Sequence, residues 1–237
     1  MMLRAKDDFP ADVEAPRNQT TVAYEALRAD ILSGRHVPGK KLKIQELAEE
    51  FGVSPGAVRE ALSRLVPEEL VVSRDQRGFL VAPLSLADLA DLTDIRCEVE
   101  SLALRRSVAL GDVNWEAGLL AAEHRLRSKA PPVGAEDPML KWRQNHAAFH
   151  RALVSGCGSR RLIGLHAQLY EQSERYRGLS NHVDPDRDVD DEHHRIVEFA
   201  LARDADALVH AMVEHLRVTT QLIVDAFGRK ASAANAE

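Results

Sequence analysis

Two short segments with helical apolar spacing, joined by a tight glycine-containing turn, restrict the fold more than any other feature of this sequence. Residues 44–51 repeat apolar side chains at helical spacing, and Gly52 ends that segment. Ser54 is placed to cap a second helix, and Pro55 suits the first position of that helix. A further helix is expected at residues 20–33. The pattern predicts a helix-turn-helix.

Two β-prone runs follow the second helix. Residues 70–73 and 78–82 are short and rich in β-branched or aromatic side chains, and a polar, basic stretch separates them. This spacing predicts a hairpin, the wing of a winged helix-turn-helix. We expect that domain to span residues 19–83, after a flexible polar arm at residues 1–18.

The remainder of the chain shows helical periodicity and no competing strand pattern. Ser85 and Asp88 occupy capping positions at the start of the first long segment. Amphipathic segments are predicted at residues 85–110, 114–129, 136–154, 159–178, 187–202 and 205–227. We therefore expect a mainly α fold, in which an all-helical bundle of six to seven helices occupies residues 84–230 and a flexible tail occupies residues 231–237.

Charge and composition narrow the class of protein. The 237 residues have a net charge of −6, but residues 20–82 hold nine basic and nine acidic side chains, so the acidity lies mainly in the helical part. DNA binding depends on where basic groups gather, and the total charge does not exclude it. No apolar run approaches the roughly 20 residues of a membrane span, and Cys97 and Cys157 have no metal-type or redox spacing. We expect a cytoplasmic protein without membrane contact.

Four ordered sequence blocks resemble the DNA-binding domain of the GntR family of regulators. They are ILSGRHVPGKKL (31–42), ELAEEFGVS (46–54), VREALSRL (58–65) and RGFLV (77–81). The resemblance implies that the second helix of the motif enters the major groove and that the wing reaches toward the minor groove. On that basis the residues predicted to contact double-stranded DNA are Lys41, Lys43, Ser54, Arg59, Arg64, Arg74 and Arg77. The alternative is that these side chains form an ordinary solvated helix face.

The chain departs from the family pattern at two places in this domain. Pro55, Gly56 and Ala57 stand where most members have Arg, Thr and a Pro or Thr, so an arginine that could read guanine is missing. The usual Glu-Gly before the wing is Glu68-Glu69 and follows a proline. We therefore expect the second helix of the motif to end early or to be kinked.

The helical part resembles the FCD effector domain of the FadR branch of GntR regulators. The matching blocks are DLTDIRCEVE (91–100), AFHRALVSGCGSRRL (148–162), DEHHRIVEFALARDADAL (191–208) and VEHL (213–216). The resemblance implies an effector-binding and dimerisation domain. The protein would then act as a homodimer on a pseudo-palindromic operator, because two recognition helices read half-sites about one DNA turn apart.

Four histidines predict a metal site inside the bundle. His146 and His150 share one helix face, and His193 and His215, on two later helices, could converge on them. Such a set suits a divalent transition metal, Zn²⁺ or Ni²⁺. In metal-binding FCD domains three positions match as histidine, whereas His146 replaces an Asp or Asn, and Asn145 lies off that face. The alternative is hydrogen-bonded core histidines. We assign surface or general polar roles to His124, His166, His182, His194 and His210.

A metal with an open coordination position could accept the carboxylate of a small organic acid. By the resemblance, Arg96 is the expected second contact for that carboxylate, with Arg175 and Arg177 as further candidates. For Arg96 the alternative is an ion pair with Glu100, four residues later on the same helix.

These features predict a ligand-responsive DNA-binding regulator of a metabolic operon, acting as a repressor. An alternative is a regulator whose C-terminal domain only dimerises, or binds its effector without a metal. A metal-dependent hydrolase is a remote alternative, because HAAFH (146–150) has Ala147 where a zinc protease has its general-base Glu. The chain also lacks a Gly-rich phosphate loop and a nucleophile elbow, so we do not expect an enzyme.

Overall fold

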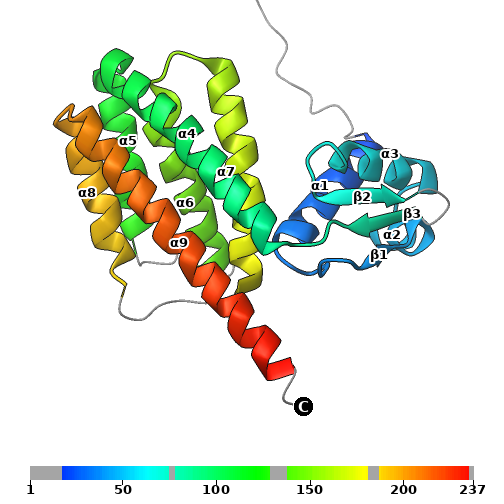
Figure 1. The fold of residues 1–237 in the computed structure, drawn as a ribbon. Coiled ribbons are helices and arrows are strands. Elements are labelled where there is room, and N and C mark those ends of the chain that lie inside the picture. Colours follow the sequence, from blue (N-terminus) through cyan, green and yellow to red (C-terminus); the bar gives the residue numbers. More distant parts are fainter. Residues whose placement is uncertain (1–17, 75–77, 129–137, 181–186, 235–237) are drawn as a thin grey trace, which may run out of the picture. The chain divides into compact units, whose positions relative to one another are not determined.

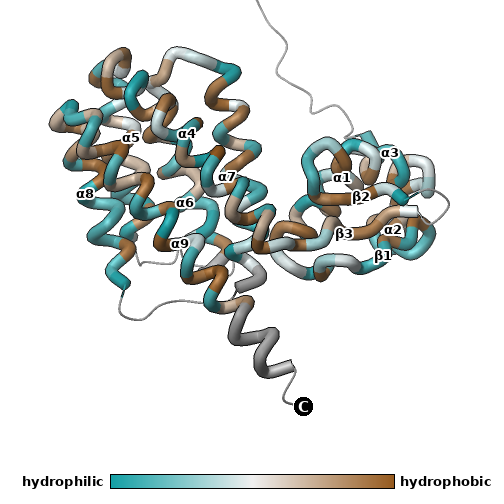
Figure 2. The backbone as a smooth tube through the Cα atoms, viewed as in Figure 1, coloured by the Kyte–Doolittle hydropathy of each residue, from teal (hydrophilic) through white to brown (hydrophobic). Residues whose placement is uncertain are grey.

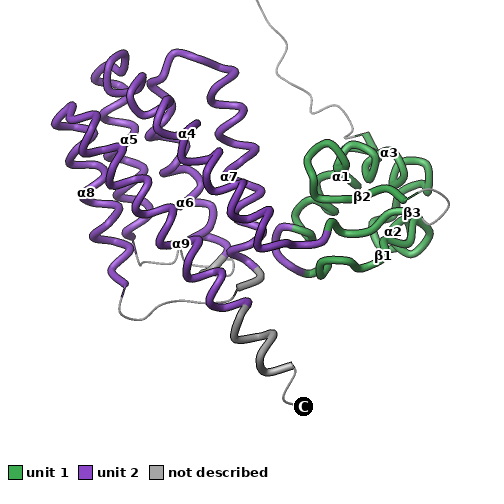
Figure 3. Tube along the Cα trace, viewed as in Figure 1, with its two compact units in different colours: residues 1–31, 35–82 green, residues 32–34, 83–237 purple. Residues whose placement is uncertain are grey.

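The computed structural model describes residues 18–74, 78–128, 138–180 and 187–234, and those residues are mostly helical, as predicted (Figure 1). The chain divides into two compact units (Figure 3). One comprises residues 1–31 and 35–82 and is called the winged unit below, and the other comprises residues 32–34 and 83–237 and is called the helical unit. In the described ranges, no helix has the length and apolar character needed to cross a bilayer.

The winged unit combines a helix-turn-helix with a small sheet. Its elements are α1 (Gln19–Leu32), β1 (Lys41–Leu42), α2 (Ile44–Phe51), α3 (Pro55–Leu65), β2 (Val71–Arg74) and β3 (Gly78–Val81). The order in the sheet is β1-β3-β2, and both pairings are antiparallel. The predicted hairpin is β2 and β3, whereas β1 was not predicted, because two residues are too few to show a strand pattern.

The turn between α2 and α3 forms as the sequence indicated. Gly52 has a φ of 64°, a conformation that glycine adopts without steric cost, and α2 ends there. The Ser54 hydroxyl accepts a hydrogen bond from the Ala57 amide at 3.3 Å and so caps α3. The helix ends at Leu65, before the proline, and Glu69 takes a φ of 60°. That left-handed position is the one at which the family pattern has glycine, and a non-glycine residue is strained there.

The helical unit contains six helices in the described residues. They are α4 (Leu86–Leu110), α5 (Val113–Arg127), α6 (Pro138–Ser155), α7 (Arg160–Ser180), α8 (Val189–Leu201) and α9 (Ala205–Ala234). Residues 231–234, predicted as part of a tail, continue α9, which was expected to end near Phe227. Arg, Lys, Ala and Ser residues follow Gly228 in this stretch, and the alanines favour helix.

Hydrophobic and hydrophilic stretches alternate along each helix of this unit (Figure 2). The main core includes Leu104, Leu119, Phe149 and Ile196, all fully buried. A smaller apolar cluster, with Leu89 and Ile223 among its members, connects α4, α7 and α9. Burial of such side chains stabilises the bundle by about 1.5–3 kcal/mol each.

The turn after α8 contains the second non-glycine residue with positive φ in the described part of the chain. Arg203 has a φ of 59°. Its guanidinium donates to the Val108 carbonyl at 2.6 Å, pairs with Glu116 and lies 5.1 Å from the centre of the Trp115 ring. The strained backbone at Arg203 is therefore accompanied by contacts to both α4 and α5.

Candidate functional site

Four histidines from three helices meet inside the helical unit. His146 and His150 lie four residues apart on α6, His193 comes from α8 and His215 from α9. Each is at most 4% exposed. One ring nitrogen of each lies within 4.8 Å of the others, and the Nε2 atoms of His146 and His150 are 3.2 Å apart. The structure therefore brings together all four residues predicted as metal ligands.

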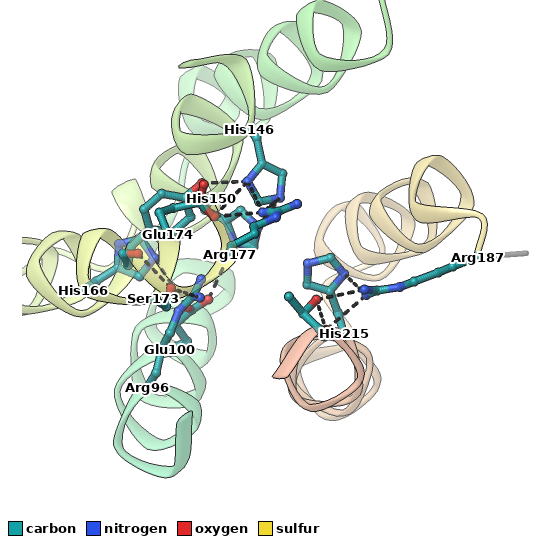
Figure 4. Close-up of polar contacts among 12 residues, drawn as sticks. Arg96, Glu100, His146, His150, His166, Ser173, Glu174, Arg177, Arg187 and His215 are labelled. Atoms are coloured by element: carbon teal, nitrogen blue, oxygen red, sulfur yellow. Dashed lines mark hydrogen bonds and ion pairs between the residues drawn. The ribbon is translucent and has the colours of Figure 1, made fainter. Parts of the chain in front are cut away.

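Two groups hold His215 in place: a carboxylate on α8, and Arg187, which reaches the imidazole as Figure 4 shows. Glu192 Oε2 is 2.7 Å from Nδ1 of His215, and Arg187 holds the same carboxylate through two hydrogen bonds of 2.6 and 2.7 Å. The Glu192 carboxylate can only accept, so Nδ1 of His215 donates and its Nε2 lone pair is left for an ion. This hydrogen bond and the arginine lower the pKa of Glu192 to about 2 in spite of burial, which acts in the opposite direction.

His146 is surrounded by aromatic and polar groups from its own helix and from α7. Its Nδ1 lies 2.6 Å from the Tyr170 hydroxyl and 3.1 Å from Nη1 of Arg177. Trp142 stacks on the imidazole at a centroid distance of 4.7 Å, and the Arg177 guanidinium covers the same indole. Arg177 in turn donates to Glu174 at 2.8 Å. These contacts fix the position of the His146 ring.

Behind His150 lies a buried ion pair on α4. Arg96 Nε donates to Glu100 Oε1 at 2.6 Å, and both side chains are at least 90% buried. Thus the alternative noted for Arg96, an ion pair with Glu100, is formed. Glu100 Oε2 lies 3.8 Å from Nδ1 of His150, too far for a direct hydrogen bond, and both atoms are buried without a partner among the described residues.

The position of His166 differs from the one expected from the sequence. It was assigned to a surface or general polar role, but it is 2% exposed, and its Nε2 lies 3.8 Å from Glu100. The helical pattern of α7 did not show that this polar position faces the bundle. Of the other histidines given such roles, those at 124 and 210 are exposed, the one at 194 pairs with Glu123, and the one at 182 lies outside the described residues.

Burial keeps the four clustered imidazoles neutral. Desolvation is the largest cause that lowers the pKa of each, and it lowers that of His150 to about 3. Neighbouring arginines and histidines lower these pKa values further. A neutral imidazole is the form that binds a metal, so no proton has to be displaced near neutral pH.

The donor set fits a transition metal ion. Both ring nitrogens of His193 are buried without a partner in the described part of the chain, an arrangement that costs free energy unless something binds there. Imidazole nitrogens suit Zn²⁺, Ni²⁺ and Cu²⁺ rather than Mg²⁺ or Ca²⁺. Nitrogens bound to one Zn²⁺ lie roughly 3 Å apart at usual bond lengths, so the histidine nitrogens, which lie within 4.8 Å of one another, would have to move closer together around an ion.

A hollow opens beside the histidines. Its lining comes from α4, α6, α7 and α9 and consists of Leu89, Thr93, Arg96, His146, His150, Ser173, Glu174, Arg177, His215, Leu216, Thr219, Thr220 and Ile223. Two predicted effector residues, Arg96 and Arg177, are therefore at the hollow. Arg175 is buried but does not belong to this lining, and Asn145 is bonded to the Arg125 carbonyl, away from the cluster.

Three of the predicted DNA contacts in the winged unit line one depression, and the others do not belong to its lining. Lys41, Lys43 and Arg59 line one open depression together with Pro55, Gly56 and Phe79, where β1, α3 and β3 meet. Arg64 instead lies over the Tyr24 ring at 4.3 Å. The Ser54 hydroxyl is engaged in the cap of α3. Arg74 is exposed on β2, and Arg77 lies outside the described residues.

Sequence reasoning missed the groups behind the histidines. Glu192 directly precedes a predicted ligand, so its position next to that ligand was a usable signal. Tyr170 and Glu174 are on α7, and nothing in the local sequence links them to residues on α6. Contacts between helices of this kind depend on how the bundle packs.

Comparisons with known proteins agree with this two-part architecture. Residues 19–81 match the model of bacterial regulatory proteins, gntR family, and residues 91–218 match the FCD domain. The chain is 39% identical over 223 residues to the "uncharacterized HTH-type transcriptional regulator BphR" of Paraburkholderia xenovorans, covering 92% of this chain and 90% of that protein. It is 35% identical over 209 residues to the "HTH-type transcriptional repressor GlaR" of Escherichia coli, covering 86% and 94%.

A solved structure shows the same fold. The protein described as "E. coli McbR/YncC" superimposes with a TM-score of 0.74 at 22% identity, over 90% of this chain and all of that chain. At this identity the likeness concerns the fold alone.

Proposed function

Because this chain belongs to the GntR family of bacterial regulatory proteins and contains an FCD domain, we propose that it is a metabolic repressor whose effector, a small carboxylate, binds at a metal site in the helical unit. The chain is a DNA-binding transcription regulator and not an enzyme. The observation that carries the effector proposal is the cluster of four buried, neutral imidazoles beside a hollow that two arginines line.

The four histidines would hold one divalent transition ion, Zn²⁺ or Ni²⁺. An ion that takes five or six ligands would supply, besides the four imidazoles, a Lewis-acid position for a carboxylate oxygen. The chain's own residues do the remaining work: Arg96 and Arg177 orient the acid from α4 and α7, and the Glu192 carboxylate holds His215 in the tautomer that can ligate. Since Arg175 does not line the hollow, we restrict the proposed contacts to Arg96 and Arg177.

In the winged unit, Lys41, Lys43 and Arg59 are the proposed centre of the DNA contact, because they share one exposed depression beside the N-terminus of α3. Helix N-termini favour phosphate groups. The proposed contacts at Ser54, Arg64, Arg74 and Arg77 extend this surface. The protein acts as a homodimer, in which two recognition helices read the half-sites of a pseudo-palindromic operator.

Control by the effector follows from the position of the hollow. The hollow is lined by residues of α4, α6, α7 and α9, so an acid bound there contacts several helices at once. It stabilises the arrangement of helices that binds it best, and a different spacing of the two recognition helices in that arrangement weakens operator binding.

The test is the metal content of the full-length protein, purified without an affinity tag or chelator and measured by elemental mass spectrometry. About one metal ion per chain is expected. A His150→Ala/His193→Ala variant should lose that ion, whereas a His124→Ala/His210→Ala control, which changes two exposed histidines of the same unit, should keep it. Circular dichroism checks that both variants fold.

Metal retained by the first variant would contradict the proposed ligands. A wild-type protein that is free of metal and still binds its operator would instead favour a helical unit that only dimerises or that binds its effector without a metal.

A further inference from the structure

Ligands that are buried need a path by which an ion can reach them. Each of the four clustered histidines is at most 4% exposed, so an ion cannot bind to them directly from solvent. The hollow beside them has a volume of about 20 Å³ in this arrangement of the helices, which is room for about one water molecule. A divalent ion with its hydration shell is larger than that.

A second and larger depression adjoins the cluster between α8 and α9, and is called the α8–α9 groove below. Its volume is about 170 Å³, which by the same measure is room for about ten water molecules. The groove is lined by Glu192, Arg195, Ala211, Glu214, His215 and Val218. Since Arg195, Glu214 and Val218 are exposed, the groove opens to solvent. A hydrated ion therefore has room to enter it.

His215 separates the α8–α9 groove from the other ligand candidates. Among the described residues, it is the one member of the cluster that lines both the hollow and the groove. Its Nδ1 lies 2.7 Å from Glu192, which also lines the groove. In Figure 4, His215 and Arg187 stand apart from the group that includes Arg96 and Arg177. An ion that comes from the groove meets this imidazole first.

The charged side chains of the lining differ in sign between the two depressions. Two arginines and one glutamate line the hollow, whereas two glutamates and one arginine line the α8–α9 groove. Carboxylates attract a divalent cation and offer oxygen ligands in place of the waters that it gives up. Guanidinium groups repel it. Both the volume and the charge therefore favour the groove for a cation.

We propose that the α8–α9 groove is the route by which the metal ion reaches the cluster, and that His215 is the side chain that moves to admit it. This inference rests on the proposed function, because it presumes that the cluster binds an ion. The carboxylates of Glu192 and Glu214 first bind the incoming ion. Glu192 then exchanges its hydrogen bond to Nδ1 of His215 for a bond to the ion, and the released imidazole turns and lets the ion pass.

The test measures how fast the chelator-treated, full-length protein takes up Co²⁺, by stopped-flow fluorescence at roughly 0.1 M salt. Trp142 stacks on His146 at a centroid distance of 4.7 Å, so bound Co²⁺ quenches its emission. Glu214→Gln should lower the second-order rate constant of uptake about threefold, because the groove loses one negative charge. Arg195→Gln should raise it by a similar factor. Both side chains are exposed, so we expect both variants to fold.

Asp225→Asn is the matched control. It removes an exposed carboxylate from the same helix as Glu214, about 16 Å further along, and should keep the wild-type rate. The visible absorption spectrum of the final Co²⁺ complex reports the ligand set and should be the same in all four proteins.

The outcomes separate the route from the site. Opposite changes of rate in Glu214→Gln and Arg195→Gln, which shrink as salt is added, would support the inference. Wild-type rates in both variants, with an unchanged final spectrum, would overturn the inference and leave the metal site intact. A wild-type protein that takes up no Co²⁺ would contradict the proposed function itself, and the inference with it.

Discussion

In the winged unit the proposed DNA contacts Lys41, Lys43 and Arg59 are exposed, whereas in the helical unit the four clustered histidines are buried and neutral. Lys43 has only a solvent-exposed partner, Glu46, at 2.6 Å. His215, in contrast, is held by Glu192, which Arg187 holds in turn. The DNA contacts act through charges that water and salt screen. The histidine cluster acts through nitrogen donors that the bundle shields from solvent.

This difference predicts which substitutions and solution conditions the DNA contacts and the histidine cluster each tolerate. An exposed basic surface depends little on its neighbours, so single substitutions should alter binding without altering the fold. A buried cluster shares its stability with the core, so conditions that charge its members should unfold the unit that contains it. The predictions below test this contrast from the largest expected effect to the smallest.

Acid should destabilise the metal-free helical unit much more than the winged unit. The helical unit has five buried histidines with lowered pKa values, and the winged unit has His36 alone. A lowered folded-state pKa means that the stability is present above the unfolded value near 6.5 and is lost as pH falls below it, by roughly 1.4 kcal/mol per histidine and pH unit. For His150 the loss continues to about pH 3.

Hydrogen exchange of the chelator-treated full chain at pH 7 and pH 5.5 measures this loss of stability separately for each unit. Protection should fall first in α6, α8 and α9. Fluorescence gives a second signal, because Trp115 and Trp142 both belong to the helical unit. An equal loss of protection in both units would contradict the contrast.

Arg59→Ala should weaken DNA binding by about 1–3 kcal/mol, and the helical unit should be unchanged. The slope of log affinity against log salt concentration should fall by about one, the contribution of one phosphate contact. Arg64→Ala should cost less, since that guanidinium lies over Tyr24. Fluorescence anisotropy across a salt series, with a duplex selected by the wild-type protein from a random pool, measures both. Arg105→Ala, an exposed arginine on α4, is the control. Wild-type affinity in Arg59→Ala would count against the docking surface.

Glycine should have opposite effects at the two strained positions. Glu69→Gly removes a left-handed conformation that favours glycine, and we expect the winged unit to gain about 0.5 kcal/mol. Arg203→Gly relieves the same strain but loses the contacts to Val108, Glu116 and Trp115, so the helical unit should lose about 1 kcal/mol or more. Chemical denaturation gives both values. Stabilisation by both substitutions would show that the Arg203 contacts contribute less than the backbone strain costs.

Much of the fold could be predicted because its signals are local. Gly52, Ser54 and the apolar spacing of α3 specify a turn, a cap and a buried face within a few residues. The six helices of the bundle were predicted from periodicity in the same way. The strand β1 was missed, since its pairing with Leu80 is a contact over 39 positions that leaves no pattern in two residues.

The histidine cluster could be predicted only in part. The spacing of His146 and His150 shows a shared helix face, and the resemblance to FCD domains added His193 and His215. The sequence did not show that Glu100 lies between His150 and His166, because that depends on the packing of α4 against α6 and α7. It also did not separate Arg177, which lines the hollow, from Arg175, which does not.

The position of His215 on α9, after every other described helix, has a consequence for biosynthesis. The chain is made from its N-terminus, so every element of the winged unit has been synthesised before the first of the four histidines. α9 supplies the fourth histidine and part of the hollow, and it leaves the ribosome after the other described helices. A nascent chain can therefore present a complete DNA-reading unit while its sensor is unfinished, and premature termination before α9 would yield a chain without the complete sensor.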